Sequence, residues 1–274
     1  MEGIEARAWA SLPVISATES LLDDNGMVAT TALLADDSYP LANRVIGLGL
    51  ERPISPSLLD RLCEIFDARG NDAIFIPQAP TARPPTLPRL LKERGFEPAV
   101  KEAKLYRSTQ DPPATDPRDE VIRATEADYE QVLSMYRSGG MQADWAEVMV
   151  RNLGRPGWHH FIARHEGRAV AIGAMFAEGG FAMCFSSWSL PAYRQRGFRS
   201  ALMSHRIAAA GELGCHWVGA NVFVEDEPLS ENLRSHRLLG FELLYVRTTH
   251  VRHRPGVSPP DASRRRMLEK VNRT

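Results

Sequence analysis

Hydrophobic and polar positions change period repeatedly along residues 119–254. Short runs rich in β-branched and aromatic residues predict strands, and longer segments with a hydrophobic residue about every three to four positions predict amphipathic helices. The predicted strands are Glu120–Ala124, His159–Arg164, Ala169–Phe176, Phe181–Trp188, His216–Val224 and Phe241–Val251. The predicted helices are Tyr129–Tyr136, Trp145–Leu153, Ser200–Leu213 and Ser230–Leu239. This order predicts an α/β fold of the α+β type, built on a mixed sheet.

Capping and turn residues stand at the ends of these predicted elements. Thr125 is placed to cap the first helix, with Asp128 three residues later, as in a capping box. Glu166-Gly167 and Gly179-Gly180 separate three successive strands and predict tight turns. Gly214 follows the longest helix and predicts its C-terminal end.

The N-terminal half repeats part of this pattern in a weaker form. The expected strands are Met27–Ala35, Arg44–Leu50, Ala73–Ile76 and Lys101–Arg107, and the expected helices are Ser57–Ala68 and Leu87–Glu93. The first two strands are predicted to pair around a turn at Asp36–Pro40.

Two short segments suggest an internal duplication. Leu91–Phe96 and His236–Phe241 are both helix ends that lead through Gly-Phe into a strand. A tyrosine follows near the middle of each of these strands, Tyr106 in one and Tyr245 in the other. The repetition predicts two related halves.

Two proline-rich polar stretches divide the chain. The segment from Ser108 to Arg118 reads STQDPPATDPR, and the segment from Pro255 to Ala262 precedes a basic tail. Such stretches bury little surface and lack backbone donors at proline, which is typical of linkers. We therefore expect an N-terminal domain over 1–107, a linker over 108–118, a second domain over 119–254 and a tail over 255–274. The two halves are expected to pack on each other.

Composition and charge restrict the function without assigning it. The chain has 274 residues, 43% of them hydrophobic and 24% charged, with a formal net charge of −1. These values are typical of a globular protein and predict no general attraction to nucleic acid or to an anionic membrane. Three separated cysteines without metal-ligand spacing predict reduced thiols and no metal site. An N-terminus without an export pattern adds to the expectation of a cytoplasmic protein, either a monomer or a homodimer.

The segment from Trp188 to Ser200 carries the candidate chemistry. It connects a predicted strand to the longest predicted helix and reads WSLPAYRQRGFRS. A helix N-terminus presents unpaired N–H groups and a partial positive charge, so it can bind phosphate where the backbone is accessible. Gly197 provides that access, and Arg194, Arg196 and Arg199 add cationic donors. An ordinary strand–helix connection with a solvated basic face is the alternative.

The residues Pro191–Arg199 resemble the acetyl-CoA loop of the GCN5-related N-acetyltransferase family. That pattern has Arg or Gln, two residues, Gly, one residue and then Gly or Ala. Arg194 and Gly197 match it, whereas Arg199 departs from the last small position. The resemblance extends over about Val121 to Arg252. It implies a tandem protein with two such domains, the C-terminal one complete and the N-terminal one degenerate, which binds acetyl-CoA in its C-terminal half.

The resemblance also implies roles for individual residues. A backbone N–H near Trp188, Ser189 and Leu190 is expected to polarise the thioester carbonyl, with Ser189 as the catalytic position. His236 stands where many family members have a tyrosine that donates a proton to the leaving thiolate, and Tyr245 is a second candidate. The expected acetyl-CoA-binding residues are Trp188, Ser189, Leu190, Arg194, Gln195, Arg196, Gly197, Phe198, Arg199, Ser200 and Asn221.

The implied activity is direct transfer of an acetyl group from acetyl-CoA to a primary amine of a small molecule or peptide. The general base is open, because the strand over 181–188 has no carboxylate. Glu178, Asp144, Glu147 and His160 are weak candidates, and Cys184 is expected to be buried and inert. The alternative is a non-catalytic module of the same fold that binds acyl-CoA or another protein.

Overall fold

The computed structural model describes residues 1–12, 28–30, 43–114, 120–139, 141, 143–224 and 231–257. Its strands form one ten-stranded sheet in the order β1-β2-β3-β10-β4-β9-β8-β7-β6-β5. The strands are β1 (Val28–Thr30), β2 (Arg44–Ile46), β3 (Ala73–Gln78), β4 (Glu97–Ser108), β5 (Glu120–Ala124), β6 (Trp158–His165), β7 (Arg168–Glu178), β8 (Phe181–Ser189), β9 (Trp217–Val224) and β10 (Glu242–His253). The pairs β2–β3 and β8–β9 are parallel and the other pairs antiparallel. The mixed α/β fold predicted from the sequence is confirmed.

The helices lie in the order expected from the sequence, with one addition at the start. They are α1 (Glu2–Ala10), α3 (Pro56–Ala68), α4 (Leu87–Glu93), α5 (Tyr129–Ser138), α6 (Ala143–Val150), α7 (Phe198–Glu212) and α8 (Glu231–Leu238), with short 3-10 turns η1 (Glu126–Asp128) and η2 (Pro191–Tyr193). The predicted capping box of Thr125 and Asp128 is present. The predicted turn at residues 36–40 and the basic tail lie outside the described residues.

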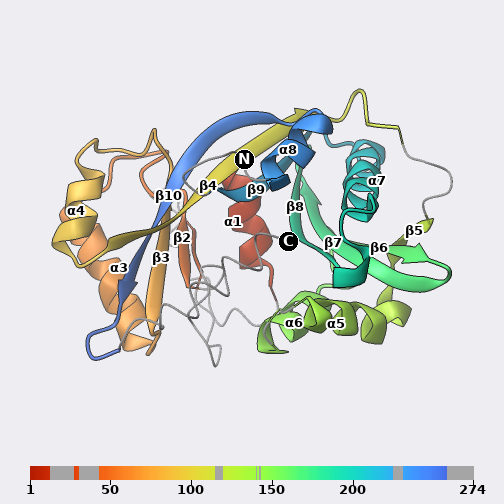
Figure 1. Cartoon of the computed structure of the whole chain (residues 1–274). Coiled ribbons are helices and arrows are strands. Elements are labelled where there is room, and N and C mark those ends of the chain that lie inside the picture. Colours follow the sequence, from red (N-terminus) through yellow and green to blue (C-terminus); the bar gives the residue numbers. More distant parts are fainter. Residues whose placement is uncertain are drawn as a thin grey trace.

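The two halves of the chain exchange their longest strands. Strand β10, from the C-terminal half, lies between β3 and β4 of the N-terminal half, and β4 in turn lies between β10 and β9. In Figure 1, β4 and β10 cross from one side of the molecule to the other as a long antiparallel pair. The C-terminal domain was expected to be complete, but it does not form its sheet alone. The edge of β9 is paired with β4 of the N-terminal half, and β10 lies one strand further away. The boundary expected near residue 107 does not separate two sheets.

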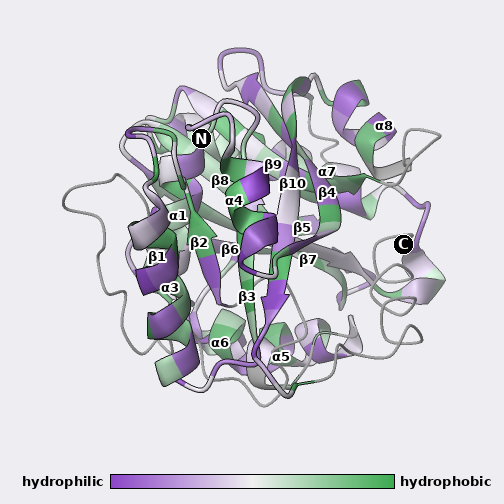
Figure 2. Cartoon of the chain, turned by 90° about the vertical axis from the view of Figure 1, so that its left-hand side faces the viewer, coloured by the Kyte–Doolittle hydropathy of each residue, from purple (hydrophilic) through white to green (hydrophobic). Residues whose placement is uncertain are grey.

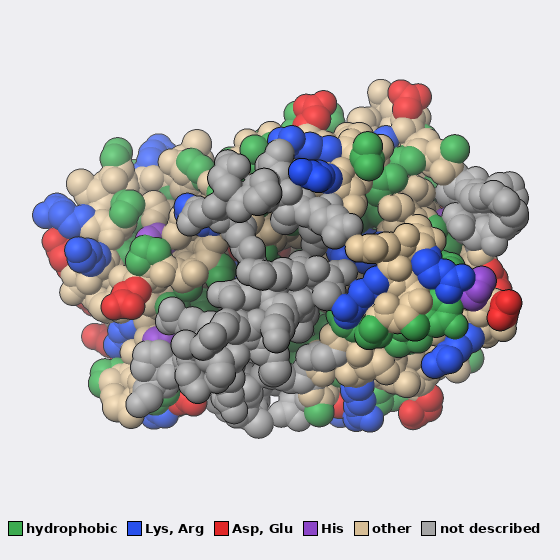
Figure 3. Space-filling model, in the orientation of Figure 1, with side chains coloured by type: hydrophobic (Ala, Val, Ile, Leu, Met, Phe, Trp, Pro, Cys, Tyr) green, Lys and Arg blue, Asp and Glu red, His purple; other side chains and the backbone are tan. Residues whose placement is uncertain are grey.

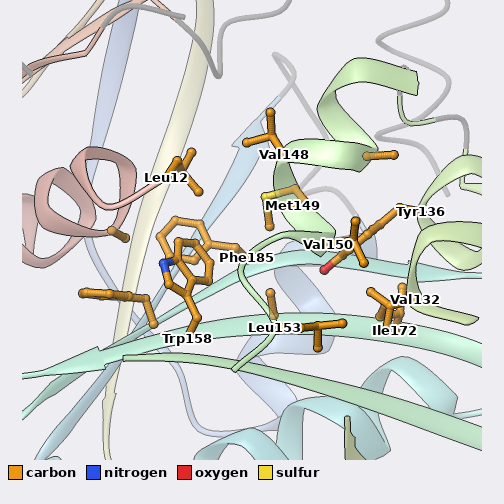
Figure 4. Close-up of a cluster of buried hydrophobic side chains, with 14 of the residues drawn as sticks. Leu12, Val132, Tyr136, Val148, Met149, Val150, Leu153, Trp158, Ile172 and Phe185 are labelled. Carbon is orange, nitrogen blue, oxygen red and sulfur yellow. The ribbon is translucent and has the colours of Figure 1, made fainter. Parts of the chain in front are cut away.

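Helices cover both faces of the part of the sheet formed by β5–β9. Helices α1, α5 and α6 share one hydrophobic core with residues of β6, β7 and β8. Helix α7 and Leu233 of α8 belong to the core on the other face. Figure 4 shows the first core, where the rings of Trp158 and Phe185 lie together beneath Leu12 and α6.

Helices α3 and α4 cover β3 in the N-terminal half. Helix α3 begins at the N-cap Ser55, whose side chain accepts a hydrogen bond from the Leu58 N–H, and it buries Leu59, Leu62 and Phe66. Hydrophobic and hydrophilic bands alternate along α3 in Figure 2, as the burial of one face requires. This third core joins both helices to residues of β3.

Helix α1 is not predicted by the sequence pattern. It buries Glu2, Ile4, Glu5, Ala6, Ala8 and Trp9, which together surround the helix instead of forming one stripe. A helix buried on most sides has no amphipathic period, so the usual helical signal is missing. Its position between the two halves in Figure 1 explains this burial.

On the face shown in Figure 3, the coloured side chains form no large patch of one charge sign. Basic and acidic side chains are interspersed over both halves among the coloured atoms of that view. Among the described helices, none combines the length and the hydrophobicity needed to cross a lipid bilayer.

Candidate functional site

Strands β8 and β9 diverge in the centre of the sheet. They pair over only four positions, from Phe181 opposite Trp217 to Cys184 opposite Ala220. Beyond that point β8 remains paired with β7, and β9 remains paired with β4 through Val224. The inner edges of β8 after Cys184 and of β9 after Ala220 therefore face a gap, with backbone groups that the sheet does not use.

A β-bulge accompanies this divergence. The register of β7 and β8 shifts between the pairs Ala174–Phe185 and Ile172–Trp188, and Ser186 has a φ of 50°. The guanidinium of Arg206, from α7, fills the bulge. It donates to the carbonyls of Ala174 at 3.0 Å and Phe185 at 3.3 Å, and to the Ser187 hydroxyl at 2.7 Å.

Arg206 is fully buried, and among the described residues no carboxylate forms an ion pair with it. Burial of a charge without a counter-ion costs several kcal/mol, so hydrogen bonds to carbonyl dipoles must offset the cost. The sequence analysis did not identify this residue. The spacing of Arg206 could have shown that it is buried. It follows Leu202 by four positions and Met203 by three, which places it on the same buried face of α7.

The loop after β8 leads directly to the N-terminus of α7. Its N-cap is Gly197, which has a φ of 88° and no side chain with which to cap the first turn. Gln195 also has a positive φ, of 57°. The backbone N–H groups at the start of α7 are thus not capped by the N-cap side chain, and this helix end can attract an anion.

Aromatic side chains hold the loop against β6. The rings of His165, Tyr193 and Phe198 meet edge to face, with centroids 5.7 to 6.0 Å apart. The Arg196 guanidinium lies 5.1 Å from the centre of the Tyr193 ring, and one of its nitrogens lies 3.4 Å from His165 Nε2. The basic residues of this loop are therefore partly positioned by ring contacts.

Trp188 connects the loop to α5. The Arg194 guanidinium lies 4.8 Å from the centre of the Trp188 ring. Gly139 packs so closely on this ring that a Cβ there would lie 2.8 Å from its nearest atom. The predicted residues Trp188 and Arg194 are thus brought together, and Gly139 makes room for them.

Several buried polar atoms at the end of β8 have no hydrogen-bond partner among the described residues. They are Trp188 Nε1, Ser189 Oγ and Arg194 Nε. Buried polar atoms are normally paired, so these three atoms are available to hydrogen-bond with a polar ligand.

The backbone direction distinguishes the three positions expected to face the thioester. The Leu190 N–H donates to the Val170 carbonyl at 2.8 Å, on the β7 side, which excludes Leu190 as a donor to a ligand in the gap. Successive N–H groups of a strand point to opposite sides. The N–H of Ser189 therefore points away from β7, toward the gap.

His236 and Asn221 lie on opposite faces of the sheet. His236 is buried, and its ring meets the Phe241 ring edge to face at 5.3 Å, in the core under α7 and α8. Asn221 is the first residue of β9 after the pairing with β8 ends, and its amide donates to Glu5 of α1 at 3.0 Å. Tyr245 also points toward α1, where its hydroxyl donates to Glu2.

The general-base candidates from the sequence are mostly engaged elsewhere. Glu178 pairs with Arg7 at the surface, and Glu147 accepts from Tyr129 at 3.0 Å and from Arg137 at 2.7 Å. The side chain of Asp144 lies outside the described part of the structure.

Two further candidates lie in hydrophobic surroundings. Burial lowers the pKa of His160 to about 4, and neither of its ring nitrogens has a hydrogen-bond partner among the described residues. Its ring lies among Trp158 and Tyr136 in the core. Burial raises the pKa of the Cys184 thiol, which keeps it protonated at neutral pH, as expected for an inert buried cysteine.

Comparison with protein families bears on this site. The acetyltransferase (GNAT) family matches residues 120–241, from the start of β5 to the residue before β10. This range contains the diverging strands, the loop and α7. Residues 120–241 form a GNAT domain. The GNAT match does not include the N-terminal half, whose relation to the family remains a prediction.

Solved structures with similar folds cover most of this chain. A GCN5-related N-acetyltransferase from Kribbella flavida has a TM-score of 0.60 and 18% identity, over 85% of this chain and 88% of its own. One from Sphaerobacter thermophilus has a TM-score of 0.59 and 16% identity, over 92% and 85%. A tandem GNAT protein from the clavulanic acid biosynthesis pathway has a TM-score of 0.56 and 13% identity, over 95% of both chains. At such low sequence identity, the structural similarity shows a shared fold only. No curated protein matches this sequence.

Proposed function

We propose that this protein is an acetyl-CoA-dependent N-acetyltransferase that transfers the acetyl group directly to a primary amine of a small molecule or peptide. One observation carries the proposal: the gap between β8 and β9 opens beside a loop that ends at the uncapped N-terminus of α7. A pantetheine chain can pair with the free strand edges while its pyrophosphate meets the helix end. The GNAT domain at residues 120–241 supports acyl transfer in general.

The backbone N–H groups from Gln195 to Ser200 are proposed to bind the pyrophosphate. Gly197 permits close approach, because this N-cap residue has no side chain of its own and no other atom lies within 4 Å of where its Cβ would be. Arg194, Arg196 and Arg199 add positive charge near the same end. The rings that hold Arg194 and Arg196 reduce the entropy lost when the ligand binds.

The Ser189 N–H is proposed to polarise the thioester carbonyl. It lies on the free edge of β8, between a bulge held by Arg206 and a backbone bond from Leu190 to β7. A fixed donor directed at a developing oxyanion is worth about 3–4 kcal/mol in other acyl-transfer enzymes. Attack by a neutral amine then expels the CoA thiolate without an acyl-enzyme intermediate. His236 remains the candidate proton donor to that thiolate.

The test is calorimetric titration of the full chain with acetyl-CoA, followed by an assay of thiol release with a panel of amines. We expect one binding site per chain, because the Arg194–Gly197 loop joins the diverging strand β8 to the N-terminus of α7. Thiol release that depends on added amine would establish turnover. Tight binding without amine-dependent release would instead indicate a non-catalytic module, and absence of binding would reject the proposal. The three free cysteines also fit the proposed location in the cytoplasm.

A further inference from the structure

Three buried cations meet between the two halves of the molecule. Arg44 comes from β2, Lys104 from β4 and Arg247 from β10, and none of them exposes more than 1% of its surface. All three belong to one network of ion pairs that also includes the carboxylate of Glu102. We call Arg44, Lys104, Arg247 and Glu102 the cationic pocket.

The strands alone leave this pocket with an excess of positive charge. Glu102 accepts from Arg44 at 3.2 Å, from Arg247 at 3.0 Å and from the Thr249 hydroxyl at 3.0 Å. One strand carboxylate thus faces three cations, which leaves two positive charges without a strand-borne counter-ion. Buried charge of this size requires partners.

Helix α1 supplies the two missing charges. Glu2 accepts from Arg247 at 2.7 Å, and Glu5 accepts from Arg247 at 2.9 Å and pairs with Lys104. Burial alone would raise the pKa of Glu5, but Arg247, Lys104 and Arg44 outweigh it and hold that pKa well below its ordinary range. The Glu5 carboxylate is therefore ionised at neutral pH.

The cationic pocket lies beside the proposed acetyl-transfer site. Lys104 is the cross-strand partner of Asn221, the residue at which β9 leaves β8. Asn221 donates to Glu5, so it faces α1, whereas α7 covers the opposite face of the sheet. The Asn221 Oδ1 atom is buried and has no hydrogen-bond partner among the described residues. An acceptor amine placed there would have its N–H groups beside this oxygen and its nitrogen near the gap.

We propose that the cationic pocket binds the acceptor substrate through two carboxylate groups, and that Glu2 and Glu5 of α1 occupy it as an internal stand-in. The proposal rests on the acetyltransferase function proposed above. A ligand that displaces α1 must replace two negative charges, so it is a dicarboxylate that also carries the acceptor amine. Replacing a network of buried ion pairs by hydrophobic residues is often neutral or stabilising, so stability alone does not account for this network.

The first experiment uses the full-length variant Glu2→Gln/Glu5→Gln and compares succinate with acetate at equal ionic strength. The variant keeps the shape of α1 and removes both charges, so we expect a lower melting temperature than wild type. Succinate should then raise the melting temperature of the variant more than acetate does, and more than it raises that of wild type. Glu178→Gln is the matched control, since Glu178 also pairs with α1 but at the surface. It should show no specific response to succinate.

The second experiment measures acetylation by the wild-type protein with L-glutamate and L-glutamine as acceptors. They differ by one carboxylate, and we expect kcat/KM to be about tenfold higher or more for L-glutamate. This comparison remains decisive if the double variant does not fold. Equal use of both acceptors would overturn the proposal, as would equal stabilisation of the variant by succinate and acetate. Acetyl-CoA titration separates the two proposals, because failure to bind acetyl-CoA rejects the transferase function alone.

Discussion

Gly173 and Arg206 occupy adjoining volumes inside the bulge between β7 and β8. A Cβ at Gly173 would lie 2.9 Å from the Arg206 guanidinium carbon. Gly173→Ala should therefore lower the free energy of unfolding by about 1–3 kcal/mol, because the guanidinium would have to leave its carbonyl partners. Urea denaturation measures this change.

The double variant Gly173→Ala/Arg206→Ala provides the control. With the guanidinium removed, the added methyl group has space. Gly173→Ala should therefore destabilise the Arg206→Ala variant by about 1 kcal/mol or more less than it destabilises wild type. Additive effects of the two substitutions would show that Gly173 is not kept small by Arg206.

His236 offers a test of the proton donor at the scale of one side chain. His236→Phe keeps most of the bulk beside Phe241 and removes the exchangeable proton. If His236 protonates the thiolate, turnover should fall by roughly 10²–10⁴-fold, while acetyl-CoA affinity stays within a few-fold. Steady-state kinetics between about pH 6 and pH 9 would check this. Unchanged turnover at saturating substrate would assign proton transfer to water or to another residue.

Helix α7 allows its two ends to be compared as an element. Gly197 at the N-terminus has a φ of 88° and Gly214 after the C-terminus has a φ of 76°, and no neighbouring atom would clash with a Cβ at either. Alanine at each position should thus cost a similar amount, about 1–2 kcal/mol of backbone strain. Only Gly197→Ala should also weaken acetyl-CoA binding, by about tenfold or more, because only that end is proposed to bind the pyrophosphate.

Calorimetric titration of both variants, with unfolding curves for each, separates binding from stability. Equal losses of affinity in Gly197→Ala and Gly214→Ala would indicate a general effect of strain on α7. Such a result would remove the helix N-terminus from the proposed binding site.

The exchange of β4 and β10 predicts that the whole molecule is the unit of folding. Strand β10 has both of its hydrogen-bonded neighbours, β3 and β4, in the N-terminal half. A fragment of residues 119–274 would leave β10 unpaired and the edge of β9 open, which favours aggregation. We expect it to be unfolded or insoluble alone and to be recovered when it is co-expressed with residues 1–114.

Circular dichroism and co-elution on size-exclusion chromatography would test this expectation. A folded fragment of residues 119–274 that binds acetyl-CoA as tightly as the full chain would contradict it. In that case the exchanged strands would add stability without being required for the site.

Local patterns were sufficient for the elements and for the proposed acetyl-CoA loop. Strands, helices and the capping box at Thr125 depend on the spacing of nearby residues, so the sequence predicted most of them to within a few positions. The loop could be proposed from the sequence for the same reason, because Arg194 and Gly197 lie directly before the helix that follows them. The bulge was not, since Arg206 reaches β7 and β8 across the sheet.

The arrangement of the two halves depended on tertiary structure alone. Along β4, Glu102 and Lys104 alternate with Ala103 and Leu105, which by itself indicates a strand with one face in solvent. In the folded chain that polar face is buried under α1 and paired with charges from β2 and β10. A period of two specifies which residues share a face but not what covers it, because the covering charges come from segments far away in the sequence. The sequence therefore determined the elements and the loop, and the tertiary structure decided the strand exchange and the cationic pocket.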